Sequence, residues 1–195
     1  MCIIHISEHH SAPKSVLEEA KTALSHFPQL ANVNIDVRFK KHIRKSTMQA
    51  QPVFSDVLRQ KKDRGYVIYI SKKVKITGHE FSTKFIPSNI IIGWLGHELG
   101  HICDYQNRSS FGLIVFGLKY LFSGAFLRAA ERSADTFAIS NGMHRYILAT
   151  KNFILDHADI PRSYKRRIQK YYLSPEEIMM LVEEKNQELH LSESN

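Results

Sequence analysis

The stretch GWLGHELGHICDY, residues 93–105, sets the strongest constraint on how this chain folds. It continues an apolar run that begins at Ile90, so it is predicted to be a buried helix. Yet it contains three glycines, each costing a helix interior about 1 kcal/mol relative to alanine. It also contains two histidines and a glutamate, which need partners when buried. We therefore expect another element, or a ligand, to approach this helix closely.

The HELGH segment indicates a metal site. His97 and His101 are four residues apart, which places both imidazoles on one side of a helix, one turn apart. Two neutral imidazoles at this spacing can bind one tetrahedral Zn²⁺. Glu98 lies beside them, where its carboxylate can accept a proton from a zinc-activated water. The pattern is typical of a zinc hydrolase.

A catalytic zinc needs a third protein ligand, with the fourth position left for water. The residues that follow His101, ICDYQNRSSFG, include no further histidine. Glu131 is the strongest candidate, because Asp135 follows four residues later on the same helical face and could accept the outer N–H of a ligand histidine. Asp104 is the alternative, either as the third ligand or as a partner of a ligand.

The segments GHELGH and ERSADTFA together resemble the gluzincin metallopeptidases, over about residues 90–142. The second segment is most similar to the branch of stress-induced and prenyl-protein-processing membrane endopeptidases, and to antirepressor-type peptidases that act on protein regulators. Unlike those relatives, the sequence shows neither several strong membrane-spanning helices nor an evident DNA-reading motif. The resemblance implies a zincin-like fold, with zinc ligands His97, His101 and Glu131, general base Glu98 and ligand partner Asp135.

The order of elements predicts an α+β fold for one zincin-like domain, residues 1–195. Residues 1–87 would hold a small mixed sheet, 88–142 the two zinc-site helices and 143–195 further helices. Helices are expected at 13–27, 52–62, from Ser88 or Asn89 to Asp104, and at 126–140, 161–172 and 175–190; strands are expected at 32–39, 66–71 and within 80–89.

The apolar segment 111–127, FGLIVFGLKYLFSGAFL, allows two interpretations. It is shorter than the roughly 20 residues that a membrane-spanning helix needs. It could be a buried or cleft-lining helix, or it could insert shallowly into a membrane.

The chain carries a formal net charge of +8, which comes from clusters of Lys and Arg. Such clusters attract nucleic acid or acidic lipid, although a solvated basic face explains them equally well and no nucleic-acid motif is evident. Cys2 and Cys103 form no ligand-spaced pair, and the N-terminus lacks a secretory signal pattern. We expect a cytoplasmic protein, with peripheral membrane contact through 111–127 as an option. The clusters are Lys40, Lys41, Arg44, Lys45; Lys61, Lys62, Arg64; Lys72, Lys73, Lys75; and Lys165, Arg166, Arg167, Lys170.

These features predict a zinc-dependent metalloendopeptidase with one Zn²⁺ and a protein or peptide substrate. Strand 66–71 could pair with an extended substrate at the cleft edge, or be an ordinary core strand. The alternatives are a regulatory antirepressor-type peptidase, a latent peptidase, and a non-catalytic zinc-stabilised module that binds nucleic acid or membrane. Candidates for stabilising the transition state are His144, Tyr146, His157, Arg162, Tyr164 and Tyr171.

Overall fold

A mixed five-stranded sheet packs against helix α2, which carries the HELGH segment. The structure, a computed structural model, describes residues 2–41, 43, 46–76, 79–82, 86–156 and 160–193. The strand order is β1-β2-β3-β5-β4, in which β2, β3 and β5 are parallel and the two outer strands are antiparallel to their neighbours. A separate antiparallel pair is formed by β6 and β7. The architecture is α+β.

The strands are β1 (Ile3–His5), β2 (His10–Pro13), β3 (Ile35–Lys40), β4 (Met48–Pro52), β5 (Tyr66–Ser71), β6 (Lys73–Ile76) and β7 (His79–Ser82). The α-helices are α1 (Leu17–Ser25), α2 (Ser88–Gln106), α3 (Ser110–Phe122), α4 (Gly124–Ser140), α5 (His144–Asp156), α6 (Arg162–Tyr171) and α7 (Pro175–Glu193).

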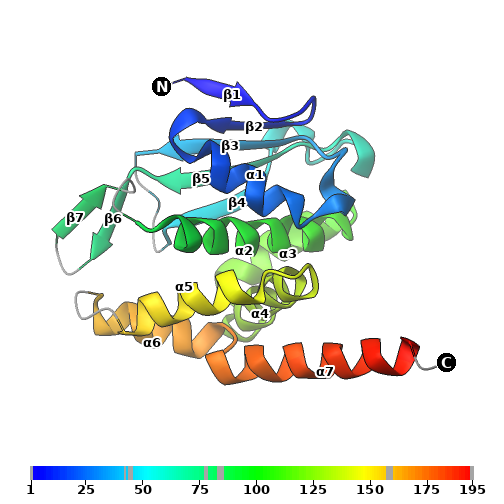
Figure 1. The fold of residues 1–195 in the computed structure, drawn as a ribbon. Helices are drawn as coiled ribbons and strands as arrows, with labels where there is room; N and C mark the ends of the chain where they lie inside the picture. Colours follow the sequence, from blue (N-terminus) through cyan, green and yellow to red (C-terminus); the bar gives the residue numbers. More distant parts are fainter. Residues whose placement is uncertain are drawn as a thin grey trace.

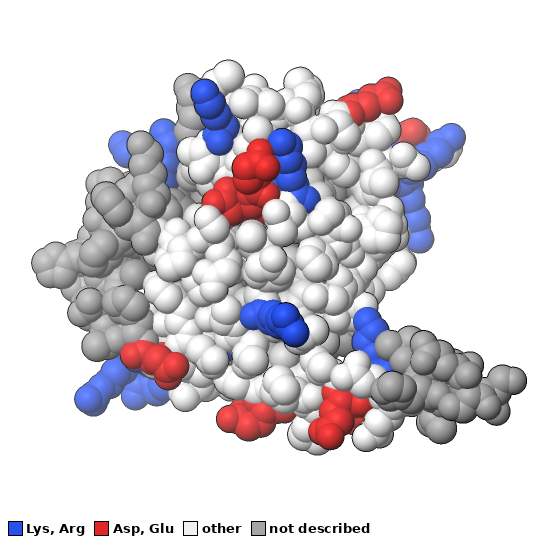
Figure 2. All heavy atoms as spheres, in the orientation of Figure 1, with Lys and Arg blue, Asp and Glu red and all other residues white. Residues whose placement is uncertain are grey.

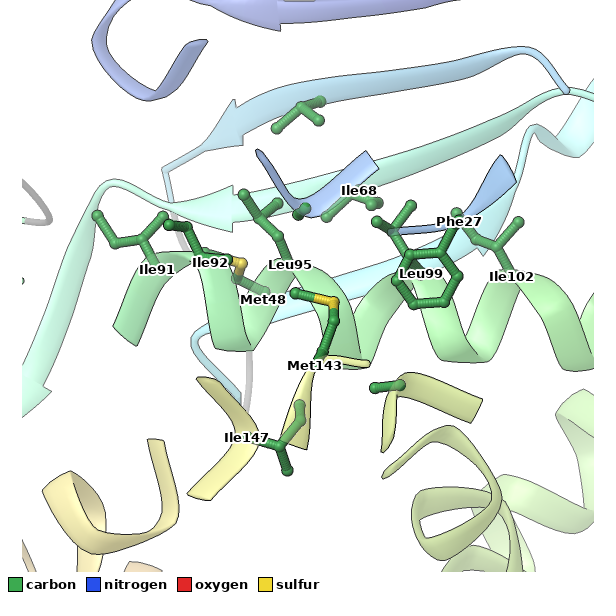
Figure 3. Packing of buried hydrophobic residues seen from close by; sticks show 14 of the residues in the cluster. Phe27, Met48, Ile68, Ile91, Ile92, Leu95, Leu99, Ile102, Met143 and Ile147 are labelled. Carbon is green, nitrogen blue, oxygen red and sulfur yellow. The ribbon is translucent and has the colours of Figure 1, made fainter. Parts of the chain in front are cut away.

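Helix α2 lies between the sheet and the C-terminal helices (Figure 1). Strands β4 and β5 and helix α1 contact it on one side, and α4 and α5 contact it on the other. Because it is covered on both sides, thirteen of its nineteen residues are buried, which explains why it is apolar almost all round. Figure 3 shows its isoleucines and leucines between residues from the sheet and residues in and just before α5: Ile91, Ile92, Leu95, Leu99 and Ile102 with Met48, Ile68, Met143 and Ile147.

All three glycines of α2 lie where a neighbouring residue is too close for a side chain. A Cβ at Gly93 would overlap with the Tyr146 carbonyl of α5, and one at Gly100 would overlap with the Ala134 carbonyl of α4. A Cβ at Gly96 would overlap with the sulfur of Met143, just before α5. The cost of the glycines is therefore offset by close packing of two helices against α2.

Several predicted elements are confirmed. Strand 66–71 is β5, and the helix expected at 126–140 is α4, which ends before Gly142 at a φ of 80°. The helix expected at 175–190 is α7. It begins with a capping box in which the Glu177 N–H donates to Ser174 Oγ at 3.2 Å and the Ser174 N–H donates to Glu177 Oε2 at 2.8 Å.

Other predictions need correction. The helix expected at 52–62 is wrong: two short 3-10 turns, Phe54–Asp56 and Lys61–Asp63, occupy this region. Phe54 and Leu58 are 92% and 81% exposed there, so the segment buries no apolar face that could stabilise a helix. The helix expected at 13–27 is confirmed only from Leu17, because strand β2 continues to Pro13.

Of the two interpretations of strand 66–71, the ordinary core strand is confirmed and the cleft edge is wrong. β5 pairs with β3 on one side and with β4 on the other, so it is an interior strand and β4 forms that edge of the sheet. Ser88 and Asn89, which could have capped α2 by their side chains, do not do so. The Ser88 hydroxyl donates to Glu19 Oε1 at 2.7 Å instead of capping the helix, and Pro87 occupies the N-cap position without a side-chain bond.

The apolar segment 111–127 spans α3 and the first turn of α4, which meet at a bend of 116°. Among the described residues, no helix is by itself long and apolar enough to cross a membrane, although this bent pair meets that test of length and composition jointly. Leu113 and Phe116 are buried, but Phe111 and Phe122 are 75% and 83% exposed. The expectation of a buried segment is therefore wrong for the outer side of α3.

We predict that Gly100→Ala lowers the free energy of unfolding by about 3 kcal/mol, because the added methyl group forces α4 away from α2. Gly117→Ala is the matched control, since no described atom beyond the adjoining backbone of α3 lies within 4 Å of a Cβ at this position. This control should be neutral or raise the stability by up to about 1 kcal/mol. Urea unfolding measures both, and equal stability of the two variants would contradict the packing argument.

Candidate metal centre

Three side chains converge between α2 and α4. His97, His101 and Glu131 each offer a ligand atom, and these atoms lie within 4.8 Å of one another. Nε2 of His97 is 3.1 Å from Glu131 Oε2, and Nε2 of His101 is 3.6 Å from the same oxygen. Ligands at zinc–ligand distances near 2.1 Å in a tetrahedron are about 3.4 Å apart, so these separations fit a single ion. The group could hold a metal ion.

The surroundings of His101 support a ligand role. Its side chain is 6% exposed, and its Nδ1 is buried with no hydrogen-bond partner among the described residues. Its Nε2 is too far from Glu131 Oε2 for a hydrogen bond. A buried imidazole with so few partners is costly, and a metal ion on Nε2 would offset that cost.

The packing of the two helices explains how these residues meet. His97 and His101 leave one side of α2 one turn apart, with ring centroids separated by 4.8 Å. The close approach of α4 at Gly100 places Glu131, one turn before Ala134, beside the two rings. Glu131 is buried, and Tyr120 of α3 donates a short hydrogen bond to its other oxygen, Oε1.

Asp135 orients His97. Its Oδ1 accepts a hydrogen bond from His97 Nδ1 at 2.8 Å, which directs Nε2 toward Glu131. Its Oδ2 accepts hydrogen bonds from Lys151 Nζ at 2.8 Å and from the Leu173 N–H at 3.1 Å. Asp135 and Lys151 are both buried, so each neutralises a charge that would be costly alone.

This network shifts the pKa values of its members. Burial opposes the charged form of His97, but hydrogen bonds to Asp135 and Glu131 outweigh it and raise its pKa to about 10. Burial likewise opposes the charged form of Glu131, but electrostatic attraction to the two neighbouring histidines, with a hydrogen bond from His97, holds its pKa well below the ordinary value. A metal ion that binds His97 Nε2 must therefore displace a proton.

Glu98 belongs to the same site but not to the ligand group. Its Oε2 accepts a hydrogen bond from the Ala50 N–H of β4 at 2.6 Å, and burial raises the pKa of its carboxyl group. Glu98 and His97 line a cavity of about 40 Å³, together with Trp94, Tyr164 and Tyr172. This volume accommodates water but not a peptide.

The structure places the other candidates as follows. Asp104 lies outside the ligand group and makes a salt bridge to Arg108, four residues later, at 2.9 Å. Of the candidates for stabilising a transition state, Tyr164 lines the cavity, and His157 lies outside the described residues.

Sequence reasoning missed three residues of the site: Tyr120, Lys151 and Tyr172. The Tyr172 ring lies 5.3 Å from the His97 ring, and Lys151 Nζ lies 4.2 Å from the centre of the Tyr172 ring. Lys151 belongs to α5, a helix that was not predicted. Ile147, Lys151 and Ile154 have helical spacing and are buried together. Because one of these inner positions is a lysine, the sequence does not show a continuous apolar side that would predict the helix.

Comparison of the chain with protein-family models, with curated proteins and with solved structures finds no match. The functional argument therefore rests on the chemistry and geometry of the described residues.

We predict that Lys151→Met lowers the free energy of unfolding by about 3 kcal/mol, because it removes one of the two cationic partners of the buried Asp135 carboxylate. Lys185→Met is the matched control. It removes a half-buried lysine whose Nζ donates to the carbonyl of the exposed Ser140 and makes no ion pair among the described residues, and it should cost less than about 1 kcal/mol. Chemical denaturation compares the two variants, and losses of similar size would argue against the buried ion pair.

The raised pKa of His97 predicts that the metal-free protein loses stability in alkaline solution. The folded state holds the His97 proton more tightly than the unfolded state, whose histidine has a pKa near 6.5. The stabilisation is therefore complete below pH 6.5 and is lost as the pH rises toward 10. Urea unfolding in the presence of a chelator should show this decline. The decline should be smaller in His97→Gln, and an identical decline in that variant would contradict the assignment.

Proposed function

We propose that this protein is a zinc-dependent metalloendopeptidase with a zincin-like fold of the gluzincin type. One observation carries the proposal: Nε2 atoms of two histidines converge on the carboxylate of Glu131, while Glu98 faces the adjoining cavity without joining that ligand group. This separation of ligands from a free carboxylate is what a metal-assisted hydrolase needs.

Zinc is the metal that the donor set favours. Two imidazoles and one carboxylate are a common ligand set for catalytic zinc, which keeps a fourth position open. His97, His101 and Glu131 would hold the ion, and Asp135 would keep His97 in the required tautomer. When bound, zinc would polarise a peptide carbonyl and lower the pKa of a water molecule.

Glu98 would serve as the general base. Burial raises the pKa of Glu98 toward neutral pH. A general base works best when its pKa lies near the pH at which the enzyme operates. The Ala50 N–H fixes one carboxylate oxygen and leaves the other for the proton of the attacking water. Glu98 would then pass that proton to the leaving amine.

Two tyrosines are placed to stabilise the developing oxyanion. Tyr164 and Tyr172 both line the cavity beside His97 and Glu98. Burial raises the pKa values of both phenols, so each stays protonated and can donate a hydrogen bond.

We assign the role of substrate-pairing strand to β4 in place of β5. β4 forms the edge of the sheet beside α2, and Thr47 and Met48 line the cavity with Glu98. An extended peptide that added alongside β4 would bring a peptide bond to the ligand group.

The small cavity favours a latent form of this enzyme as the second candidate. Among the described residues its volume of roughly 40 Å³ is too small for a peptide, and Tyr164, Ile168 and Tyr172 on and beside α6 form part of its wall. A substrate would therefore enter only after this segment moves, as in enzymes whose lids gate turnover.

The test is Glu98→Gln in the zinc-loaded protein. Wild type should cleave members of an unstructured peptide library, detected by mass spectrometry. Glu98→Gln should reduce turnover by at least about a hundredfold, because the amide cannot accept the proton. Its zinc content, measured by elemental analysis, should equal that of wild type because Glu98 is not a ligand.

Two control variants separate the outcomes. His97→Ala should lose zinc, whereas Asp104→Ala should retain it, because Asp104 is paired with Arg108. Full turnover by Glu98→Gln would overturn the catalytic assignment. Zinc bound by wild type without cleavage, even after limited removal of the C-terminal segment, would favour a non-catalytic zinc-stabilised module.

A further inference from the structure

Helix α3 presents an unusual outer surface. Of the ten large apolar side chains that are exposed in the described part of the chain, five lie on α3 and two lie on the turns before β5. We call this set the α3 surface. Its members are Phe54, Leu58, Phe111, Ile114, Leu118, Leu121 and Phe122, with exposed fractions of 92, 81, 75, 47, 55, 75 and 83%.

The turns before β5 are tied to the start of α3. Lys61 Nζ donates to the Asn107 carbonyl at 3.5 Å, and the Ser110 hydroxyl donates to the Arg59 carbonyl at 3.5 Å. The buried Arg64 side chain reaches across to Ser110 Oγ at 3.2 Å. These bonds connect the turn that bears Leu58 to the helix that bears Phe111, so the two apolar groups belong to one region.

The charge of this region is mainly positive. No Asp or Glu occurs between Asp104 and Glu131, whereas Lys119, Arg128 and Arg108 lie in that interval, the last of these paired with Asp104 at 2.9 Å. The adjoining turns add Arg59, Lys61 and Lys62 against two aspartates, one of which is paired with Arg59 at 3.3 Å. The face drawn in Figure 2 differs, because its Lys and Arg side chains are scattered and interspersed with Asp and Glu.

We infer that the α3 surface docks on an anionic lipid bilayer, with α3 lying in the plane of the interface. Thirteen helical residues are about 20 Å long, and Phe111, Ile114, Leu118, Leu121 and Phe122 share one side of the helix. The exposed phenylalanines and leucines would enter the boundary of the acyl chains. The Lys and Arg side chains that border them would contact the phosphate groups of the lipids.

A lipid surface fits better than a protein partner. Lys119 is the only charged side chain of α3, and the five outer apolar side chains offer no hydrogen-bonding group. Protein interfaces of ordinary size carry about ten direct hydrogen bonds, which this surface cannot supply. The acyl chains of a bilayer need no hydrogen bonds from the protein. The anionic headgroups supply negative charge for Lys61, Lys62 and Lys119.

The test is co-sedimentation of the full chain with vesicles of phosphatidylcholine, with or without about a third phosphatidylserine. The protein should bind the anionic vesicles, and binding should weaken as salt is raised. Leu118→Glu with Phe122→Glu should lower the partition coefficient at least tenfold. Lys61→Gln with Lys62→Gln should weaken binding to anionic vesicles and make it less dependent on salt.

Met180→Glu is the matched control, because this α7 side chain is 61% exposed and lies outside the α3 surface. It should leave binding unchanged, and circular dichroism should show that every variant is folded. Failure of wild type to bind anionic vesicles would overturn the proposal. A dimer in sedimentation equilibrium that Phe122→Glu dissociates would also overturn it and would assign the surface to a second copy. None of these results depends on bound zinc or on peptidase activity.

Discussion

The close packing of α4 against α2 at Gly100 is the constraint on which the site depends. The Ala134 carbonyl of α4 occupies the space that a side chain at position 100 would fill. This contact fixes the separation of the two helices just where His97 and His101 project, and it brings Glu131 within ligand distance of both. If the helices were farther apart, the buried side chains of His97, His101 and Glu131 would lose their contacts with one another. Buried polar groups without partners are costly in an apolar interior.

The buried charges form an alternating series. Lys151, Asp135, His97 and Glu131 follow one another as cation, anion, cation and anion, with contacts of 2.8, 2.8 and 3.1 Å. Each charge has an opposite neighbour, so the series is tolerable where a single buried ion would not be. A metal ion that bound here would replace the proton that lies between His97 and Glu131. The network could therefore hold a metal ion in place of that proton.

The sequence predicted the local part of the site well, because helical spacing alone places His97 and His101 on one side and Glu131 and Asp135 on another helix. It could not identify Lys151, Tyr120 or Tyr172, whose roles depend only on how distant helices pack. The same division applies to the fold. β5 is rich in β-branched and aromatic residues and was predicted residue for residue, whereas β2 and β4, with the sequences HSAP and MQAQP, show no alternation that would reveal them.

The two opposite sides of helix α3 differ in their contacts. Its outer side is apolar, while Tyr120 on its inner side donates a hydrogen bond to Glu131. A short helix moves as a rigid rod, so a force that turns the outer side also turns the tyrosine. Such a rotation would release Oε1 of Glu131 and let the carboxylate swing relative to the histidines. Helix α3 thus connects the outer surface of the molecule to one carboxylate oxygen of Glu131 through the hydroxyl group of Tyr120.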